Sequence, residues 1–102
     1  MQITRITRKY VDVEVTSQLR DGTPATIAGI DVTALPTGHT PNGATVWTAA
    51  TWATGKATFL IAGPDASPTG ALAIPASGAT IWGRVNDQPE VDVERLTDIY
   101  VR

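Results

Sequence analysis

The sequence predicts an all-β protein whose strands form a sandwich or a small barrel, and three observations lead to that class. The chain holds sixteen Thr and fourteen Ala but only two Lys and three Glu. Residues that favour exposed helices are therefore scarce, whereas β-branched residues, which favour strands, are abundant. Apolar and polar residues alternate in several short segments, and Gly and Pro separate these segments at intervals of roughly ten to fifteen residues.

Length and composition exclude several other classes. The 102 residues are enough for one domain with its own core. Because the chain has no Cys, it is not a disulfide scaffold. No apolar run approaches the roughly 18 residues of a membrane helix, and the start of the chain lacks the apolar stretch of a secretion signal. With a net charge of −2, we expect neither nucleic acid nor a membrane as a partner.

The first half of the chain predicts two strands. Over residues 10–15, three valines alternate with Tyr, Asp and Glu, which is typical of a half-buried strand. The Arg-Asp-Gly-Thr-Pro sequence at 20–24 predicts a turn. A second strand is expected over 26–35, where Ile30, Val32 and Ala34 share one face. The following residues, 36–43, contain two Pro and two Gly and are predicted to form a loop.

The second half predicts five more strands, one of them a short edge strand within a Gly- and Pro-rich loop. They lie at 44–53, 56–62, 71–74, 79–86 and 96–101. A tight turn at Gly55 and a turn at 87–89 join neighbouring strands, and Val91 and Val93 lead into the last one. Of the two architectures, we favour an immunoglobulin-like sandwich of about seven strands over 10–102, a class in which many members lack a disulfide.

The first nine residues contain a short repeat, in which Ile3-Thr4-Arg5 is followed by Ile6-Thr7-Arg8. Its period of three matches neither a strand nor a helix. One interpretation is an extended N-terminal arm over 1–9 that contacts a partner through its Ile and Arg side chains. The other is a plain first edge strand. The sequence leaves both open.

The residues that could carry catalysis or bind a metal predict neither an enzyme nor a cofactor. His39 is the only imidazole, and the three serines, Ser17, Ser67 and Ser77, fall in predicted turns without the Gly-x-Ser-x-Gly motif of hydrolases. One His without Cys cannot form a closed zinc site. We therefore expect a protein that is not an enzyme and has no bound metal.

Acidic residues gather near the end of the chain, at Asp87, Glu90, Asp92, Glu94 and Asp98. In an extended segment Glu90, Asp92 and Glu94 would line one face while Val91 and Val93 point inward. Such carboxylates could bind calcium, but a strand spreads them along its length. A solvated face or an interface is the better interpretation.

The total charge hides a polarity along the chain. Residues 1–20 have four basic and two acidic residues, a balance of +2, whereas residues 86–98 have five acidic residues and Arg95, a balance of −4. If the first and last strands are neighbours, these charges could pair within one molecule. If they are apart, copies or other subunits could pair end to end.

Three tryptophans, Trp47, Trp52 and Trp82, offer a choice between a sugar-stacking platform and apolar packing. Trp47 and Trp52 are an odd number of residues apart, so in one regular strand they face opposite sides. Trp also fills space in a chain with one Phe. Packing in the core or an interface is therefore favoured.

Four segments resemble small immunoglobulin-like proteins of tailed bacteriophages that infect actinobacteria. The segments are ITRKYVDVEV at 6–15, WTAATW at 47–52, LIAGP at 60–64 and IWGRVNDQPEV at 81–91. They occur in the order found in that family and cover most of the chain. The chain departs from the pattern at Gly83, where a larger residue is usual, and this affects the expected local packing.

The resemblance implies a structural component of a virion, assembled in the host cytoplasm. The expected role is a decoration, or cement, protein bound to major capsid subunits. Alternatives are a head-to-tail connector or tail component, and a carbohydrate-binding module of a fibre. Expected partners are the major capsid protein, other virion subunits or further copies of the chain. The candidate interface residues are Ile3, Arg5, Ile6, Arg8, Lys9, Glu90, Asp92 and Glu94.

Overall fold

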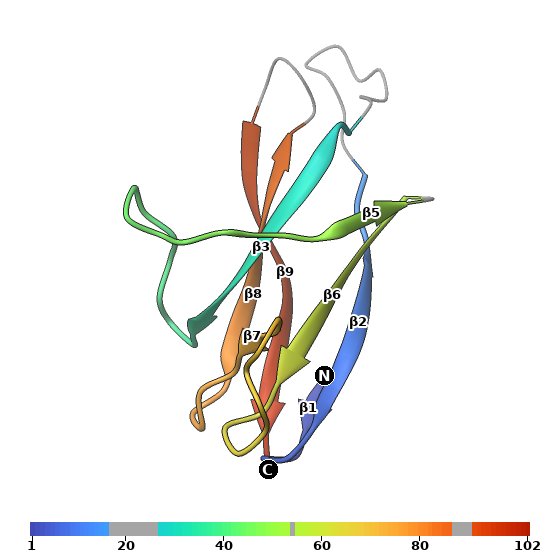
Figure 1. Ribbon diagram of the computed structural model, residues 1–102. Coiled ribbons are helices and arrows are strands. Elements are labelled where there is room, and N and C mark those ends of the chain that lie inside the picture. Colours follow the sequence, from blue (N-terminus) through green and yellow to red (C-terminus); the bar gives the residue numbers. More distant parts are fainter. Residues whose placement is uncertain (17–26, 54, 87–90) are drawn as a thin grey trace.

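The strands of the computed structural model form two sheets packed face to face (Figure 1). The structure describes residues 1–16, 27–53, 55–86 and 91–102. Within these ranges there are nine strands and no helix. The predicted all-β class and the sandwich arrangement are confirmed, and the sheets are not joined into a barrel. The turns predicted at 20–24 and 87–89 lie outside the described residues.

The larger sheet has the strand order β1-β9-β8-β3-β4, and the smaller has the order β2-β6-β5 with β7 beside β6. The larger sheet consists of β1 (Gln2–Ile3), β9 (Val91–Val101), β8 (Ala79–Asn86), β3 (Gly29–Pro36) and β4 (Thr48–Ala49). The smaller sheet consists of β2 (Arg8–Glu14), β6 (Lys56–Ala62), β5 (Thr51–Ala53) and β7 (Leu72–Ala73). Neighbouring strands are antiparallel, except that β1 is parallel to β9 and β7 is parallel to β6.

Alternate residues of both sheets build the core between the layers. In β2 the predicted alternation is confirmed, because Val11 is buried while Tyr10 and Asp12 are exposed. The largest fully buried side chains are Val32, Ile61, Ile74, Ile81, Val85 and Ile99. Each such side chain stabilises the fold by about 1.5–3 kcal/mol relative to an exposed one.

A β-bulge in β9 changes which face its residues present. The register with β8 shifts between Ile81 and Trp82, so that Leu96 is the extra residue in β9. Ile99 faces the core, but Val91 and Val93 are 59% and 48% exposed. The prediction that these two valines point inward is therefore wrong, because one inserted residue reverses the alternation on one side of the bulge.

Residues 44–53 form two short strands in different sheets, where one strand was predicted. β4 pairs with β3 and β5 pairs with β6. Between them, the Ala50 amide donates to the Ile30 carbonyl at 3.0 Å. The chain therefore crosses from the larger to the smaller sheet at Ala50. The predicted turn at Gly55 is confirmed, and its φ of 76° is one that glycine adopts readily.

The N-terminal residues belong to the sandwich. Gln2 and Ile3 pair with Tyr100 and Val101 at the edge of the larger sheet, and Ile3 is only 3% exposed. Of the two interpretations of 1–9, the structure forms the edge strand at Gln2–Ile3 and not an arm that leaves the domain. A partner could contact Ile3 only if β1 detached, because the core already covers this side chain.

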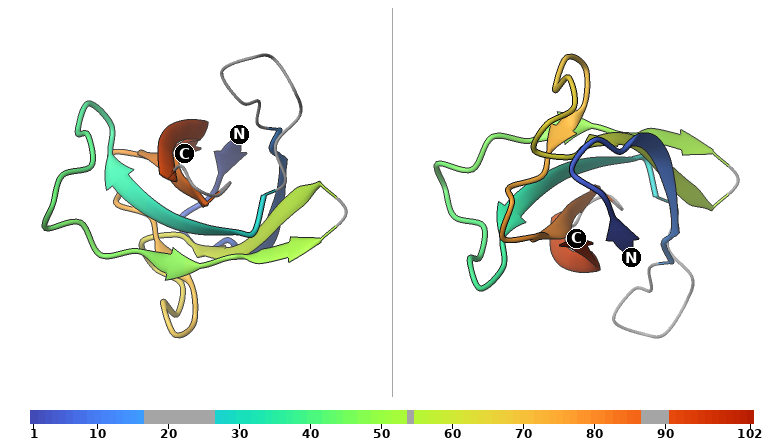
Figure 2. Two further views of the ribbon diagram at one scale, coloured as in Figure 1. Left: turned by 90° about the horizontal axis from the view of Figure 1, so that it is seen from above. Right: turned by 90° about the horizontal axis from the view of Figure 1, so that it is seen from below.

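Both chain termini lie at one end of the sandwich, which we call the terminal end (Figure 1). The two views along the long axis show the two layers and the crossing of the first segment between them (Figure 2). The molecule measures 44 × 27 × 20 Å. Features at its two ends are therefore well separated.

Candidate functional site

The turn between β1 and β2 is built by the two threonines of the N-terminal repeat. The Thr7 amide donates to the Thr4 carbonyl at 3.2 Å, and the Thr4 amide donates to Thr7 Oγ1 at 3.0 Å. The two hydroxyl oxygens are 2.9 Å apart. The spacing of three residues in the repeat therefore places the two threonines at the two ends of a tight turn. This turn connects β1 in the larger sheet to β2 in the smaller sheet.

This turn is held against the loop that follows β6. The Gly63 amide donates to the Thr7 carbonyl at 2.7 Å, and the Asp65 amide donates to the Arg5 carbonyl at 2.8 Å. A Cβ atom added at Gly63 would lie 2.6 Å from the Arg5 oxygen and 2.7 Å from the Thr4 oxygen. The close approach of these two backbones requires glycine at this position.

Arg5 and Arg8 both bind this loop. Arg5 donates from Nε and Nη2 to the Asp65 carboxylate at 2.9 and 3.3 Å. Arg8 donates to the carbonyls of Ser67 and Thr69 at 3.1 and 2.6 Å. The hydrogen bond from Arg5 lowers the pKa of Asp65, and the same bond raises the pKa of Arg5. These exposed contacts orient the loop more than they stabilise the fold.

The side chains of the repeat thus have different environments. Ile3 is buried, whereas Ile6 is 75% exposed at the turn. Lys9 is exposed in β2. Of the predicted N-terminal interface residues, Arg5, Ile6, Arg8 and Lys9 are accessible at or beside the terminal end, and Ile3 is not.

An apolar hollow of about 510 Å³ lies beside the turn. It is lined by Ala34, Pro36, Gly63, Pro64, Ala66, Pro68, Ala73, Ile74 and Pro75. The loop that binds Arg5 and Arg8 supplies four of these residues, so the hollow and the turn share one structural support. The hollow and the role of Asp65 were not predicted from the sequence, although the density of Gly and Pro at 63–75 was a signal that this loop has a fixed shape.

Two residues of the acidic cluster lie far from the basic N-terminal residues. Asp92 and Glu94 are in β9, opposite Val85 and Gly83, and Glu90 lies outside the described residues. Asp92 is eight residues from Tyr100, the partner of Gln2, which corresponds to about 26 Å along the strand. β1 and β9 are neighbours, yet Asp92 and Glu94 lie at the opposite end of the sandwich from Arg5 and Arg8, so these described charges do not pair within one molecule.

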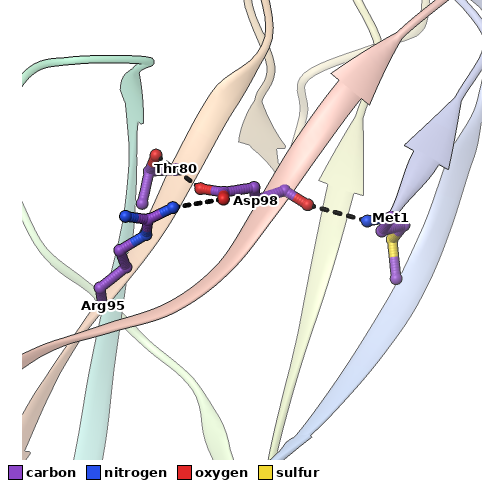
Figure 3. Close-up of polar contacts among 4 residues, drawn as sticks. All are labelled: Met1, Thr80, Arg95 and Asp98. Carbon is purple, nitrogen blue, oxygen red and sulfur yellow. Dashed lines mark hydrogen bonds and ion pairs between the residues drawn. The ribbon is translucent and has the colours of Figure 1, made fainter.

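Asp98, the fifth acidic residue, anchors the start of the chain. Its carboxylate accepts hydrogen bonds from Arg95 and, at 2.9 Å, from Thr80 (Figure 3). Its backbone carbonyl accepts a bond from the amino group of Met1 at 3.0 Å. The bond from Arg95, then that from Thr80, lowers the pKa of Asp98. This carboxylate has a structural role.

The tryptophans do not share one face. Trp52 lies opposite the buried Ala57 and packs against the core. Trp47 stacks with Arg84, whose guanidinium carbon is 5.1 Å from the ring centroid. They border different parts of the sandwich, so the three rings form no single platform.

Arg84 and Trp47 nevertheless line a second hollow. It measures about 380 Å³ and also contains Pro41, Asn42, Gly43, Thr45 and Val93. Arg84 is fixed by hydrogen bonds to Asp31 Oδ2 at 3.1 and 2.6 Å. Sequence reasoning missed this pair, because Asp31 and Arg84 become neighbours only through the pairing of β3 with β8.

In the described parts of the chain no three His, Asp or Glu side chains are grouped so that they could hold a metal ion. His39 is exposed in the loop after β3, and Ser67 and Ser77 are exposed. Ser17 is not among the described residues. The geometry supplies no arrangement of nucleophile and base within these ranges.

No helix long and apolar enough to span a membrane is present in the described residues. Comparison of the chain with family models, with curated proteins and with solved structures finds no match. The strongest candidate contact surface lies at the terminal end, where the exposed turn 4–7, the two arginines and the proline-lined hollow are close together.

Proposed function

We propose that this protein is a structural component of a bacteriophage virion, without enzymatic activity, that decorates the capsid by binding major capsid subunits. The observation that carries the proposal is the resemblance of four segments, in order, to small immunoglobulin-like proteins of tailed phages. The strand order supports that resemblance. In the immunoglobulin naming, β2-β6-β5 corresponds to B-E-D, and β9-β8-β3 corresponds to G-F-C with β4 as C′.

The terminal end is the surface we assign to the capsid contact. It presents the exposed Ile6 next to an apolar hollow, and it holds Arg5 and Arg8 in fixed positions. Apolar groups and arginines are the groups enriched in protein interfaces. Many weak contacts of this kind on a repetitive capsid would give tight overall attachment.

The number of copies in a particle tests the proposed role. Quantitative mass spectrometry of purified virions should find the protein on the order of hundreds of copies, in a fixed ratio to the major capsid protein. A count of about six or twelve would instead assign it to the head-to-tail connector or tail. Absence from purified particles would contradict any virion role.

A point substitution tests the surface. Ile6→Asp should reduce occupancy on capsids at least about tenfold, because it places a charge in the apolar contact, while thermal unfolding stays unchanged. Val46→Asp is the matched control, since Val46 is 82% exposed in a different loop. Equal occupancy of the two variants would show that the turn 4–7 is not the contact.

The hollow beside Trp47 favours the alternative of a carbohydrate-binding module, because sugars stack on aromatic rings. Tryptophan fluorescence during titration with a glycan library would test this function. A saturable change that is absent in Trp47→Ala would favour the sugar-binding role over decoration.

A further inference from the structure

β2 is a long, regular free edge of the sandwich. The strand spans seven residues, Arg8–Glu14, and within the described residues it pairs on one side only, with β6. The edge strands β1, β4, β5 and β7 have only two or three residues each. β9 also has an uncovered edge in the described residues, because β1 pairs with it only at Tyr100 and Val101, but a β-bulge interrupts that strand. In Figure 1 β2 forms the outer border of the smaller sheet along its whole length. A long exposed edge is a template for a further strand.

The hydrogen bonds to β6 define which backbone groups of β2 are free. The Gly63 amide donates to the Thr7 carbonyl, and the Val15 amide donates to the Gly55 carbonyl. In an antiparallel ladder the residues that bond to the neighbour alternate, so the odd residues from Thr7 to Val15 face β6. The N–H and C=O groups of Arg8, Tyr10, Asp12 and Glu14 therefore point away from the sheet.

We propose that this edge binds the same edge of a second copy, antiparallel and with the two-fold axis at Val11. Arg8 then lies opposite Glu14 of the second copy, and Tyr10 lies opposite its Asp12. All residues in these pairs have outward backbone groups. Each pair exchanges two hydrogen bonds, so four pairs give eight bonds across the joined sheets.

Charge complementarity and the number of hydrogen bonds together select this register. It places opposite charges at both ends of the joined strands and no like charges opposite one another. A slip of two residues in one direction places Asp12 opposite Asp12 of the second copy. A slip of two residues in the other direction places Arg8 opposite Asp12 of the second copy, which keeps opposite charges together, but it leaves three hydrogen-bonded pairs within β2 in place of four. A slip of one residue places the outward backbone groups of one copy opposite residues of the other copy whose backbone groups already bond to β6, so no hydrogen bonds can form between them.

The exposed tyrosine adds apolar contact to the same interface. Tyr10 is 71% exposed although it lies in the middle of β2. In the proposed register the two Tyr10 side chains are diagonal neighbours on one face, within reach of one another. Arg8 retains unused N–H donors for Glu14 of the second copy, because a guanidinium has five and two of its nitrogens bond to Ser67 and Thr69.

Sedimentation of the full chain tests the proposal, which does not depend on the virion role. We expect reversible association from 10.7 kDa to twice that mass at micromolar concentrations. Asp12→Pro removes an outward N–H without removing a bond to β6, and should weaken the dimer at least about tenfold relative to Asp12→Ala. Both variants lose the hydrogen bond from Thr58 to Asp12, so Ala controls for that loss. A monomer at about 1 mM, or equal dimerisation of both variants, would overturn the proposal.

A single cysteine tests the register, because the chain has none of its own. At the two-fold axis, residue 11 faces its own copy in a non-hydrogen-bonded pair, with Cα atoms about 4.5 Å apart, within the range of a disulfide. Val11→Cys should therefore cross-link the dimer on mild oxidation. Val13→Cys is the control, since two copies of residue 13 would be about 14 Å apart. Cross-linking of Val13→Cys but not of Val11→Cys would contradict the register.

Discussion

At the scale of single residues, Gly63 determines how closely the first turn approaches the sandwich. The space for its side chain is occupied by backbone oxygens of Thr4 and Arg5. Backbone atoms cannot rotate away as a side chain can, so a methyl group here must displace the turn.

Gly63→Ala should therefore lower the free energy of unfolding by about 1–3 kcal/mol, measured by urea denaturation. Gly43→Ala is the control, because nothing lies within 4 Å of its added methyl group. Equal stability of the two variants would contradict the packing of the turn against this loop.

Asp98 gives the fold a predictable dependence on pH. Its pKa in the folded protein is lowered, first by the hydrogen bond from Arg95 and then by that from Thr80. Its stabilising contribution is therefore complete above the unfolded pKa of about 3.9 and is lost as the pH falls through the lower folded value.

Asp98→Asn should reduce the melting temperature at pH 7, and the difference from the native chain should shrink as the pH falls below the unfolded pKa of about 3.9. Thermal unfolding followed by circular dichroism at several pH values measures this difference. A difference that persists unchanged at low pH would show that the charge of Asp98 is not what stabilises the strand.

At the scale of elements, the strand positions follow from alternation, while the bulge in β9 does not. Among the odd-numbered residues at 91–101, Val91, Val93, Ile99 and Val101 are apolar, and Arg95 and Thr97 separate the two pairs. Leu96 interrupts the alternation because its side chain fills the space above Gly83. Arg95 at an odd position and Leu96 at an even one signal that the alternation changes here, but which residue is inserted depends on the pairing with β8.

Gly83 and Leu96 should consequently be energetically coupled. A Cβ at Gly83 would lie 2.9 Å from Leu96 Cδ1, so Gly83→Ala and Leu96→Ala should each destabilise the fold. The double variant should lose at least about 0.5 kcal/mol less than the sum of the two. Urea denaturation of the four proteins measures the coupling, and strict additivity would contradict it.

The short strands β4 and β5 show a second limit of local patterns. Alternation continues through 44–53, but the chain changes sheets at Ala50. A strand period reports which face a residue occupies and carries no information about which layer the strand joins.

At the scale of the whole molecule, the sequence shows that the N-terminal repeat is unusual, but it does not show which of its side chains are buried and which are exposed. Arg5 and Arg8 depend on a loop about sixty residues away, and the hollow beside them needs three segments to come together. The distance of Asp92 and Glu94 from the N-terminal arginines depends on how β1 meets β9, which the sequence does not show.

The repeat connects the fold to the proposed contact surface, because Ile3 belongs to the core and Ile6 to the exterior. Truncation of residues 1–9 would remove both, whereas point substitutions separate them. The most direct test compares the free energy of unfolding of Ile3→Ala and Ile6→Ala. Ile3→Ala should cost about 2–4 kcal/mol, and Ile6→Ala should stay within about 0.5 kcal/mol of the native chain. Small and equal losses in both would show that the first residues are a detached arm and contradict the account.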